Sequence, residues 1–581
     1  MPQADGASAG LAARLSTART RIAPAWLFAF AAAVGGLFIY LLLPARVVLL
    51  DDDFGYLKSI IQTWQHGRPW TDDFLEPWNA ASSSLSAAVF ALTGNFHFST
   101  YGLQAIFAAI VLFGLCTLLS ARGFSSRATV ALAAFMLTFP VMLCRALEYT
   151  GMILYLPCLV GAIWAAERQR WGIFTVVWLL AATNRQSAVV WLALPAYTAA
   201  RALFTRSVGG FAGARLPLAV VLGGLAVIAF MHAAMNPTDA QRLLLYQTFA
   251  RFHPLTALRT IAAGATIFLL AVGFSAAVLT LSRCAPGPRP AWRGAALGLV
   301  VALAVVLLLL DERYLANPDH IDIRWRGGWV YSKLIVALAL AGWIGFRFRV
   351  LPAPALCAAA SILVISLRAS LGDYYFIDAA LLGFFAVVPT RSENSGPTTS
   401  SLLLFPHWKP ALVTGLILAG LFHLQSALHL KTVLDEAHAV SSLYERALRQ
   451  GQLRHYETVD APFGFSGWHL YSHAVARRTS TRIRWFSALL AAPVKSVELT
   501  VVYPDSFPRR WRSEKRGEPD PNAVTLAETT ARIGWFWSCR YVLQRHAPPL
   551  EPSPLGPHFR PFVFPLNNHE WRELAAGPPL P

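Results

Sequence analysis

Long uncharged apolar stretches recur along most of the chain, and they are the strongest constraint on its fold. A helix needs about 20 residues to cross about 30 Å of hydrocarbon. Apolar windows that could serve as spans cover 23–43, 101–120, 128–144, 152–166, 171–183, 187–200, 216–235, 260–281, 294–310, 328–346, 350–367, 377–389 and 410–427. We therefore expect a polytopic α-helical membrane protein with about thirteen transmembrane helices. Several windows are short, as is common where helices line a cavity.

The composition agrees with this class, since 55% of the 581 residues are hydrophobic and only 14% are charged. Five of the six cysteines lie in or beside apolar spans, and only Cys539 lies in the polar tail. This pattern indicates neither a disulfide framework nor a zinc site. The first span follows Arg14, Arg19 and Arg21 as a signal peptide would, but it is too long and no cleavage pattern follows it. We expect a retained helix.

The distribution of charge predicts the orientation. If residues 1–22 are cytoplasmic, every inside loop is basic, with Arg122, Arg127, Arg168, Arg170, Arg201, Arg206, Arg215, Arg283, Arg289, Arg293, Arg347, Arg349, Arg391 and Lys409 on that side. The opposite loops hold nearly all the acids of the membrane domain, 23–427. The net charge of +18 then follows from topology, and no nucleic acid partner is expected. We expect a multi-pass protein of the inner (cytoplasmic) membrane whose C-terminal domain, 428–581, is extracytoplasmic.

Three consecutive carboxylates, Asp51, Asp52 and Asp53, follow the first span directly. A charge at the end of a membrane helix is unfavourable unless it has a functional role. The block opens a long external loop, 51–99, whose amphipathic stretches and tryptophans suit helices at the bilayer surface. Long ordered loops usually carry function, so the block is a candidate for chemistry. Alternatively, it caps a surface helix or satisfies topology.

This loop resembles the first external loop of the GT-C superfamily of membrane glycosyltransferases. The matching elements are Asp51-Asp52-Asp53-Phe54, His66-Gly67, Phe74-Leu75-Glu76-Pro77-Trp78-Asn79 and Leu92-Thr93-Gly94. The family is also similar in general plan, with many helices and often a soluble external C-terminal domain. The recognisable pattern covers about residues 45 to 190. Members usually carry two acids where this chain has three, so the pair is Asp51-Asp52 or Asp52-Asp53, and Asp52 belongs to both.

The resemblance implies transfer of a hexose or pentose from a polyprenyl-phosphate donor, as in mannosyl- and arabinosyltransferases, to a hydroxyl of a glycan, lipid or protein. Such a reaction on the extracytoplasmic face would belong to glycosylation in the cell envelope. A carboxylate can accept the proton of the acceptor as the anomeric carbon develops oxocarbenium character. Asp52 is the expected base, with Asp51 and Asp53 as alternatives because the register is open.

Glu148 lies in a short external loop after the third span, where several family members place a second acid for metal or acceptor contact. Alternatively, Arg145 and Glu148, three residues apart, form a helical ion pair at the membrane edge. A divalent metal between Asp52 and Glu148 is compatible with these residue types, but no metal-spacing motif supports it. The metal ligands are therefore unknown, and no other cofactor is expected.

The phosphate of the donor requires cations on the external face. The segment Thr183-Asn184-Arg185-Gln186-Ser187 resembles an external helix end of some GT-C enzymes and makes Arg185 the first candidate. Further candidates are Arg324, Arg326, Lys333 and Arg368. Snorkelling is the alternative for each of them. Tyr56, Glu76 and Tyr374 are the expected substrate contacts, although interfacial anchoring explains Tyr56 equally well.

Asp378 lies within the twelfth window and is expected to face the bundle and pair with a cation such as Arg368 or Lys333. Beyond residue 430 the composition becomes polar. A helix over 426–450, a strand over 497–503 and an aromatic segment at 534–537 predict a small α/β or α+β domain.

A transporter or flippase of lipid-linked saccharides is the alternative function, because it would also need intramembrane cations. Transporters usually consist of repeated halves with paired broken helices. The chain shows no such symmetry, and transport does not account for an external tail of this length. The enzyme is the favoured interpretation.

Overall fold

The computed structural model describes residues 25–45, 60, 63–64, 67, 80–122, 124–147, 151–204, 210–234, 254–283, 348–367, 376–389, 408–452, 459–460, 495–508, 512 and 517–550. Within these ranges, six helices are long and apolar enough to cross a membrane, or seven if one bent pair is a single span. All the predicted windows contain helix except 294–310 and 328–346, which lie outside the described residues.

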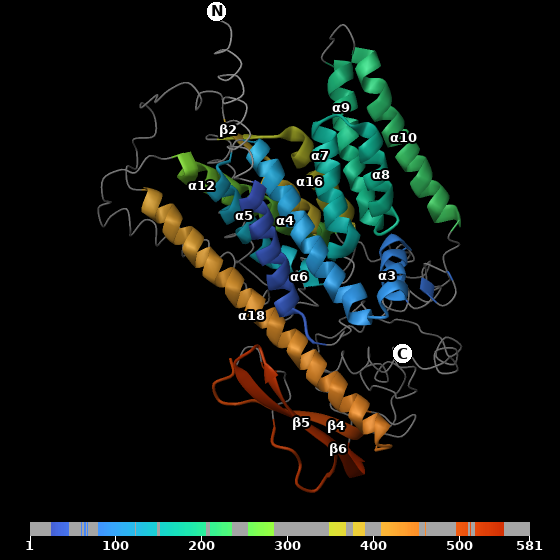
Figure 1. Cartoon of the computed structure of the whole chain (residues 1–581), viewed down its shortest axis with the longest axis vertical. Coiled ribbons are helices and arrows are strands. Elements are labelled where there is room, and N and C mark those ends of the chain that lie inside the picture. The colour runs from blue at the N-terminus through green and yellow to red at the C-terminus, as the bar shows by residue number, and fades with distance from the viewer. Residues whose placement is uncertain are drawn as a thin grey trace, which may run out of the picture.

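The helical part begins with a helix at Ala25–Leu42. The elements that follow are α3 (Ala80–Thr93), the π-helical η1 (Phe98–Gly102), α4 (Leu103–Ala121), α5 (Ser126–Thr138), α6 (Pro140–Leu147), the π-helical η2 (Gly151–Tyr155), α7 (Leu156–Glu167), α8 (Trp171–Ala182), the 3₁₀-helical η3 (Gln186–Leu192), α9 (Ala193–Phe204), α10 (Gly210–Ala234), α12 (Pro254–Arg283), α16 (Pro352–Ser366), α17 (Ile377–Phe385) and α18 (Trp408–Arg449). They form one bundle, with α18 along one side and α10 at the opposite edge (Figure 1).

The outward faces of these helices are apolar. On α10, Leu216, Leu222 and Phe230 are all more than half exposed. A soluble protein rarely leaves such a continuous apolar face in contact with water, whereas lipid tails solvate it without cost. The exposed faces therefore identify the chain as an integral membrane protein.

Local sequence signals set several helix ends. Ser125 caps α5, because its side chain accepts a hydrogen bond from the amide of Ala128 at 3.3 Å. Phe139 is extended because it precedes Pro140, whose ring excludes the helical conformation for the residue before it. The window predicted at 128–144 is consequently not straight, since α5 and α6 meet at a bend of 68°.

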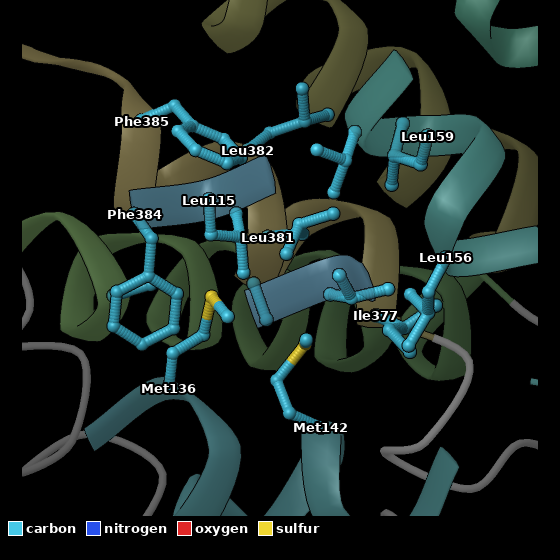
Figure 2. Packing of buried hydrophobic residues seen from close by; sticks show 14 of the residues in the cluster. Leu115, Met136, Met142, Leu156, Leu159, Ile377, Leu381, Leu382, Phe384 and Phe385 are labelled. Carbon is cyan, nitrogen blue, oxygen red and sulfur yellow. The ribbon is translucent and has the colours of Figure 1, made fainter. Parts of the chain in front are cut away.

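The short helix α17, nine residues long, lies at the centre of the bundle. All nine of its residues are buried, and it packs against α6, α12 and α16. Figure 2 shows its side chains Ile377, Leu381 and Phe384 among residues of α4, α5, α6 and α7. Nine residues rise only about 13 Å, which is less than half of the hydrocarbon thickness.

The prediction of a span at 377–389 is therefore wrong. After α17 the chain forms β2 (Val387–Pro389), which pairs antiparallel with β1 (Phe348–Val350). Continuous apolar character fits a buried core helix as well as a membrane span, and the length of the helix decides between them.

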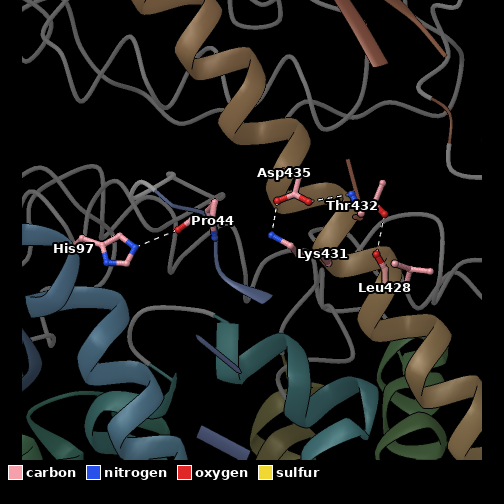
Figure 3. A network of polar contacts seen from close by, with 7 residues as sticks. Pro44, His97, Leu428, Lys431, Thr432 and Asp435 are labelled. Carbon is pink, nitrogen blue, oxygen red and sulfur yellow. Dashed lines mark hydrogen bonds and ion pairs between the residues drawn. The ribbon is translucent and has the colours of Figure 1, made fainter. Parts of the chain in front are cut away.

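Two contacts mark opposite ends of the bundle. An ion pair joins Arg122, which caps the end of α4, to Glu167, the last residue of α7. The charge pattern assigned Arg122 to the inside. At the other end, the ring nitrogen Nε2 of His97 lies 3.2 Å from the carbonyl oxygen of Pro44, which ties the end of the first helix to the start of η1 (Figure 3).

A sheet lies beyond the end of the bundle, beside the second half of α18 (Figure 1). It contains β3 (Val459–Asp460), β4 (Lys495–Val502), β5 (Val524–Ile533) and β6 (Trp537–Leu550) in the order β3-β4-β6-β5. Neighbouring strands are antiparallel except β3 and β4. The strand predicted at 497–503 coincides with β4, and the helix predicted at 426–450 is the second half of α18.

The sheet packs directly on α18. The amide of Gly534 donates to Asp435 Oδ2 at 2.9 Å, and the hydroxyl of Tyr503 donates to Glu436 Oε1 at 2.9 Å. A third bond runs from Arg446 to the carbonyl oxygen of Glu528 at 3.1 Å. One helix of 42 residues, about 63 Å long, therefore connects the bundle to the sheet.

The close packing of α17 predicts a specific sensitivity. A Cβ added at Gly383 would lie 2.7 Å from both the carbonyl oxygen of Phe268 and the Cβ of Ala271 on α12. We expect Gly383→Ala to destabilise the bundle by about 1–3 kcal/mol, because helix backbones must separate. Thermal unfolding in detergent measures this.

Gly223→Ala on α10 is the matched control. A Cβ there meets nothing within 4 Å. The control should leave stability unchanged or raise it by up to about 1 kcal/mol, since alanine favours helix. Equal midpoints for the two variants would show that α12 and α17 are not tightly packed.

Candidate functional site

A buried carboxylate, Asp378, lies on the first turn of α17 and is 1% exposed. The hydroxyl of Tyr155 donates toward both of its oxygens at 2.9 Å. The indole Nε1 of Trp191 donates to Oδ1 at 3.3 Å, and Ser361 Oγ lies 3.5 Å from Oδ2. The N-terminus of α17 adds a favourable dipole. Asp378 thus connects η2, η3, α16 and α17.

The aromatic partners of Asp378 are themselves held in place. The rings of Tyr155 and Trp191 lie 4.9 Å apart and are fully buried. The indole of Trp178 donates to the carbonyl oxygen of Ala188 at 2.8 Å, which fixes the start of η3 against α8. Ser187 Oγ lies 3.0 Å from the Tyr155 hydroxyl. Because that hydroxyl gives its one proton to the carboxylate, Ser187 is the donor in this bond.

Arg185 occupies the turn between α8 and η3, and it is 9% exposed. Its backbone is extended, and its amide donates to the carbonyl oxygen of Ala181 at 2.8 Å. Its guanidinium carbon lies 5.7 Å from the centre of the Tyr155 ring. Arg185 and Arg145 both interact electrostatically with Asp378. The positive charges of the two arginines therefore partly balance the negative charge of Asp378 in an apolar interior, where an unpaired charge of either sign would be unfavourable.

The cluster lies at an intermediate depth of the bundle. Twelve-residue helices α7 and α8 connect it to the end that carries the Arg122–Glu167 pair. Twelve residues rise about 18 Å, well short of the 30 Å of a full crossing. The short windows noted in the sequence therefore end at a buried polar cluster.

Of the predicted site residues, the structure describes Arg185 and places it beside Asp378 and Tyr155. The other predicted site residues lie outside the described part of the chain, and their roles stay predictions: Asp51, Asp52, Asp53, Glu148, Lys333, Arg368, Arg324, Arg326, Tyr56, Glu76 and Tyr374. The carboxylates suggested for a divalent metal are among them. Within the described ranges, no group of three or more His, Cys, Asp or Glu could hold a metal ion.

The expectation that Asp378 faces the bundle is confirmed, but its proposed partners, Arg368 and Lys333, are outside the described residues. Nothing in the sequence indicated the contacts with Tyr155 and Trp191, because apolar windows regularly contain aromatic residues. The only sequence features that could have indicated this cluster were Ser187 and Ser361, two polar residues within apolar stretches. Serine is common in membrane helices, so these residues did not stand out.

The arrangement assigns Asp378 a positioning role. Its oxygens already accept hydrogen bonds from a phenol and an indole, so the carboxylate is not presented to a substrate as a free base. It holds Tyr155 in place and compensates the positive charge of Arg185. A cation fixed in this way, in an interior with little water, is suited to binding an anionic group.

The network predicts coupled effects on stability. Tyr155→Phe removes the donor to Asp378, and we expect it to destabilise the bundle by about 1–3 kcal/mol, because the buried carboxylate loses a partner. Asp378→Asn should destabilise the bundle similarly. The double variant should lose less than the sum of the two losses.

Thermal unfolding of the four proteins of this cycle provides the measurement. Tyr197→Phe serves as the control, because it removes the same hydroxyl from a half-buried ring on α9. Strictly additive losses for Tyr155 and Asp378 would show that the two groups are not coupled.

No family model matches the chain, and no curated protein matches it. Three solved chains match. One is the crystal structure of ArnT from Cupriavidus metallidurans bound to undecaprenyl phosphate, with 13% sequence identity and a TM-score of 0.40 over 90% of this chain and 99% of that one. At this TM-score the likeness carries no argument for fold or function.

Proposed function

We propose that the protein is a GT-C-type glycosyltransferase that moves a sugar from a polyprenyl-phosphate donor to an acceptor hydroxyl on the extracytoplasmic face of the membrane. The observation that carries the proposal is Arg185, a cation held at intermediate depth beside Tyr155 and Asp378. The acid block at 51–53, which follows the first membrane helix in the sequence, is the second feature that the proposal requires. Both features are needed to transfer a group from a lipid-linked phosphate.

In the proposed reaction, the bond between the anomeric carbon and the phosphate oxygen breaks, and its electron pair leaves with the polyprenyl phosphate. The acceptor oxygen forms a new bond to the same carbon and transfers its proton to Asp52. Negative charge grows on the leaving phosphate as the sugar acquires oxocarbenium character. A preorganised cation such as Arg185 stabilises that charge more than it stabilises the intact donor.

The remaining predicted residues have subordinate roles in this proposal. Glu148 is the second acid, for acceptor or metal contact. Lys333, Arg368, Arg324 and Arg326 are further candidates for the phosphate, and Tyr56, Glu76 and Tyr374 for the sugar.

The alternative, a transporter or flippase of lipid-linked saccharides, would also place charge inside the membrane. It predicts movement of an intact donor, without release of polyprenyl phosphate. An assay that follows both the sugar and the lipid phosphate therefore separates the two functions.

The proposal is tested by Asp52→Asn in purified protein supplied with a panel of polyprenyl-phosphate sugars. The wild type should release polyprenyl phosphate together with a glycosylated product, whereas Asp52→Asn should lose at least about 100-fold in turnover, because an amide cannot accept the proton. Chromatography of the lipid products measures both species.

Asp51→Asn and Asp53→Asn test the register, and at least one of them should retain activity. Full turnover in Asp52→Asn would remove this residue from the mechanism. Movement of an intact donor across the bilayer, with no lipid phosphate released by the wild type, would favour the transporter.

A second prediction concerns the phosphate contact. Arg185→Ala should weaken donor binding by about 2–5 kcal/mol, because the phosphate loses a partner in a site with little water. Arg185→Lys should recover only part of the affinity, since lysine lacks the forked guanidinium. The apparent donor KM in nanodiscs measures both effects.

Arg201→Ala, which removes an exposed arginine from the last turn of α9, is the matched control and should bind donor normally. Unfolding midpoints must accompany the kinetics, because Arg185 also compensates Asp378. An unchanged KM with normal turnover in Arg185→Ala would assign this residue to the internal charge cluster alone.

A further inference from the structure

The turn between β5 and β6 presents two aromatic side chains outward. Trp535 is 42% exposed and Phe536 is 68% exposed. The next residue, Trp537, differs, because its indole donates to the carbonyl oxygen of Ser506 at 3.1 Å and its ring packs on Phe507. Trp537 thus anchors the turn to its own sheet. Trp535 and Phe536 stay partly exposed, with the Phe536 ring 5.8 Å from that of Trp537.

The backbone of this turn is unusual for its residue types. Gly534 and Trp535 have φ values of +58° and +68°. Glycine adopts this left-handed region freely, but a bulky aromatic residue costs about 1–2 kcal/mol there. Asparagine or glycine would be the ordinary choice at position 535. The presence of tryptophan indicates that its side chain has a use that offsets this strain.

The turn lies where α18 leaves the hydrocarbon. Residues 410–430 contain no Asp, Glu, Lys or Arg, and 21 helical residues rise about 31 Å, which matches the hydrocarbon thickness. The first charged residues after this stretch are Lys431 and Asp435, which form an ion pair of 2.5 Å (Figure 3). Asp435 accepts the amide of Gly534 at 2.9 Å, and Lys431 lies 5.8 Å from the centre of the Trp535 ring.

The turn also lies on the same side of α18 as its lipid-facing residues, beyond the apolar stretch. Ile417, Leu421 and Leu424 are each more than half exposed, at the spacing of three and four residues that places side chains on one face of a helix. The same spacing continues through Leu428 to Lys431 and Asp435. The turn is therefore bound to the continuation of the face that contacts lipid tails, one helical turn beyond the apolar stretch.

From this geometry we infer that Trp535 and Phe536 form a membrane anchor, which inserts into the headgroup region of the phospholipid bilayer and fixes the C-terminal sheet to the external surface. Tryptophan is enriched at this depth, because its ring is apolar and its indole N–H can still reach a polar partner. The contact continues the lipid interface of α18. It does not depend on the proposed glycosyltransferase activity.

The anchor restrains α18 at its exit from the membrane. A helix of 42 residues that protrudes from the bundle would otherwise pivot with its sheet about the exit point. The hydrogen bond from Gly534 to Asp435 on one side and aromatic insertion on the other hold the sheet at a constant distance from the bilayer.

The test uses a fluorophore attached to cysteine in the full chain, in phosphatidylcholine nanodiscs with nitroxide-labelled lipids. Phe536→Cys carries the probe at the turn. Val524→Cys, which is 61% exposed at the other end of β5, is the matched control about 30 Å away along the strand. The unmodified chain gives the background from native cysteines, of which Cys116, Cys158, Cys357 and Cys539 are buried.

Nitroxides near the headgroups should reduce the emission of the Phe536 probe roughly two-fold or more, because interfacial aromatic side chains lie at that depth. The probe at Val524 should keep its emission. Adding Trp535→Asn should reduce the quenching at position 536 while leaving the unfolding midpoint equal or higher, since asparagine tolerates the left-handed backbone. Equal quenching at positions 524 and 536 would overturn the inference. The absence of quenching at position 536 would also overturn it, and would favour a protein partner at the turn.

Discussion

A carboxylate buried in an apolar bundle requires partners, and the arrangement around Asp378 follows from this constraint. Tyr155, Trp191 and Ser361 reach it from three separate elements, and Arg185 provides compensating charge. Loss of any one contact leaves a polar group without water to replace it. Two of the segments that bring these residues together, the π-helical η2 and the 3₁₀-helical η3, depart from regular α-helix. Such departures are frequent at functional sites.

The short helices around this cluster determine its depth. Because α7 and α8 are only 12 residues long and α17 only nine, their ends meet inside the bundle and not at its surface. Polar side chains can then project from backbone turns into the interior, which uninterrupted spans would not permit. These short helices make the membrane spans difficult to count from the sequence. They also place Arg185, the cation on which the proposed function depends, inside the bundle.

At the other end, α18 links the membrane to the sheet through one uninterrupted backbone. Its first half is solvated by lipid, and its second half is covered by β5 and the turn that follows. The change occurs at Lys431 and Asp435, where an ion pair, a backbone hydrogen bond and an aromatic turn meet. The number of residues that α18 needs to cross the hydrocarbon therefore determines where along this helix the sheet can pack.

The sequence by itself determined the membrane class, most helix positions, the strand at β4 and the inward orientation of Asp378, because the length of an apolar stretch and a charge within it are local properties of the chain. It did not distinguish α17 from a membrane span, since a buried core helix and a lipid-facing helix are equally apolar. Nor did it indicate that Tyr155 and Trp191 would meet Asp378 across separations of 223 and 187 residues. Only tertiary packing decided those contacts, because they depend on which helix ends reach the same depth.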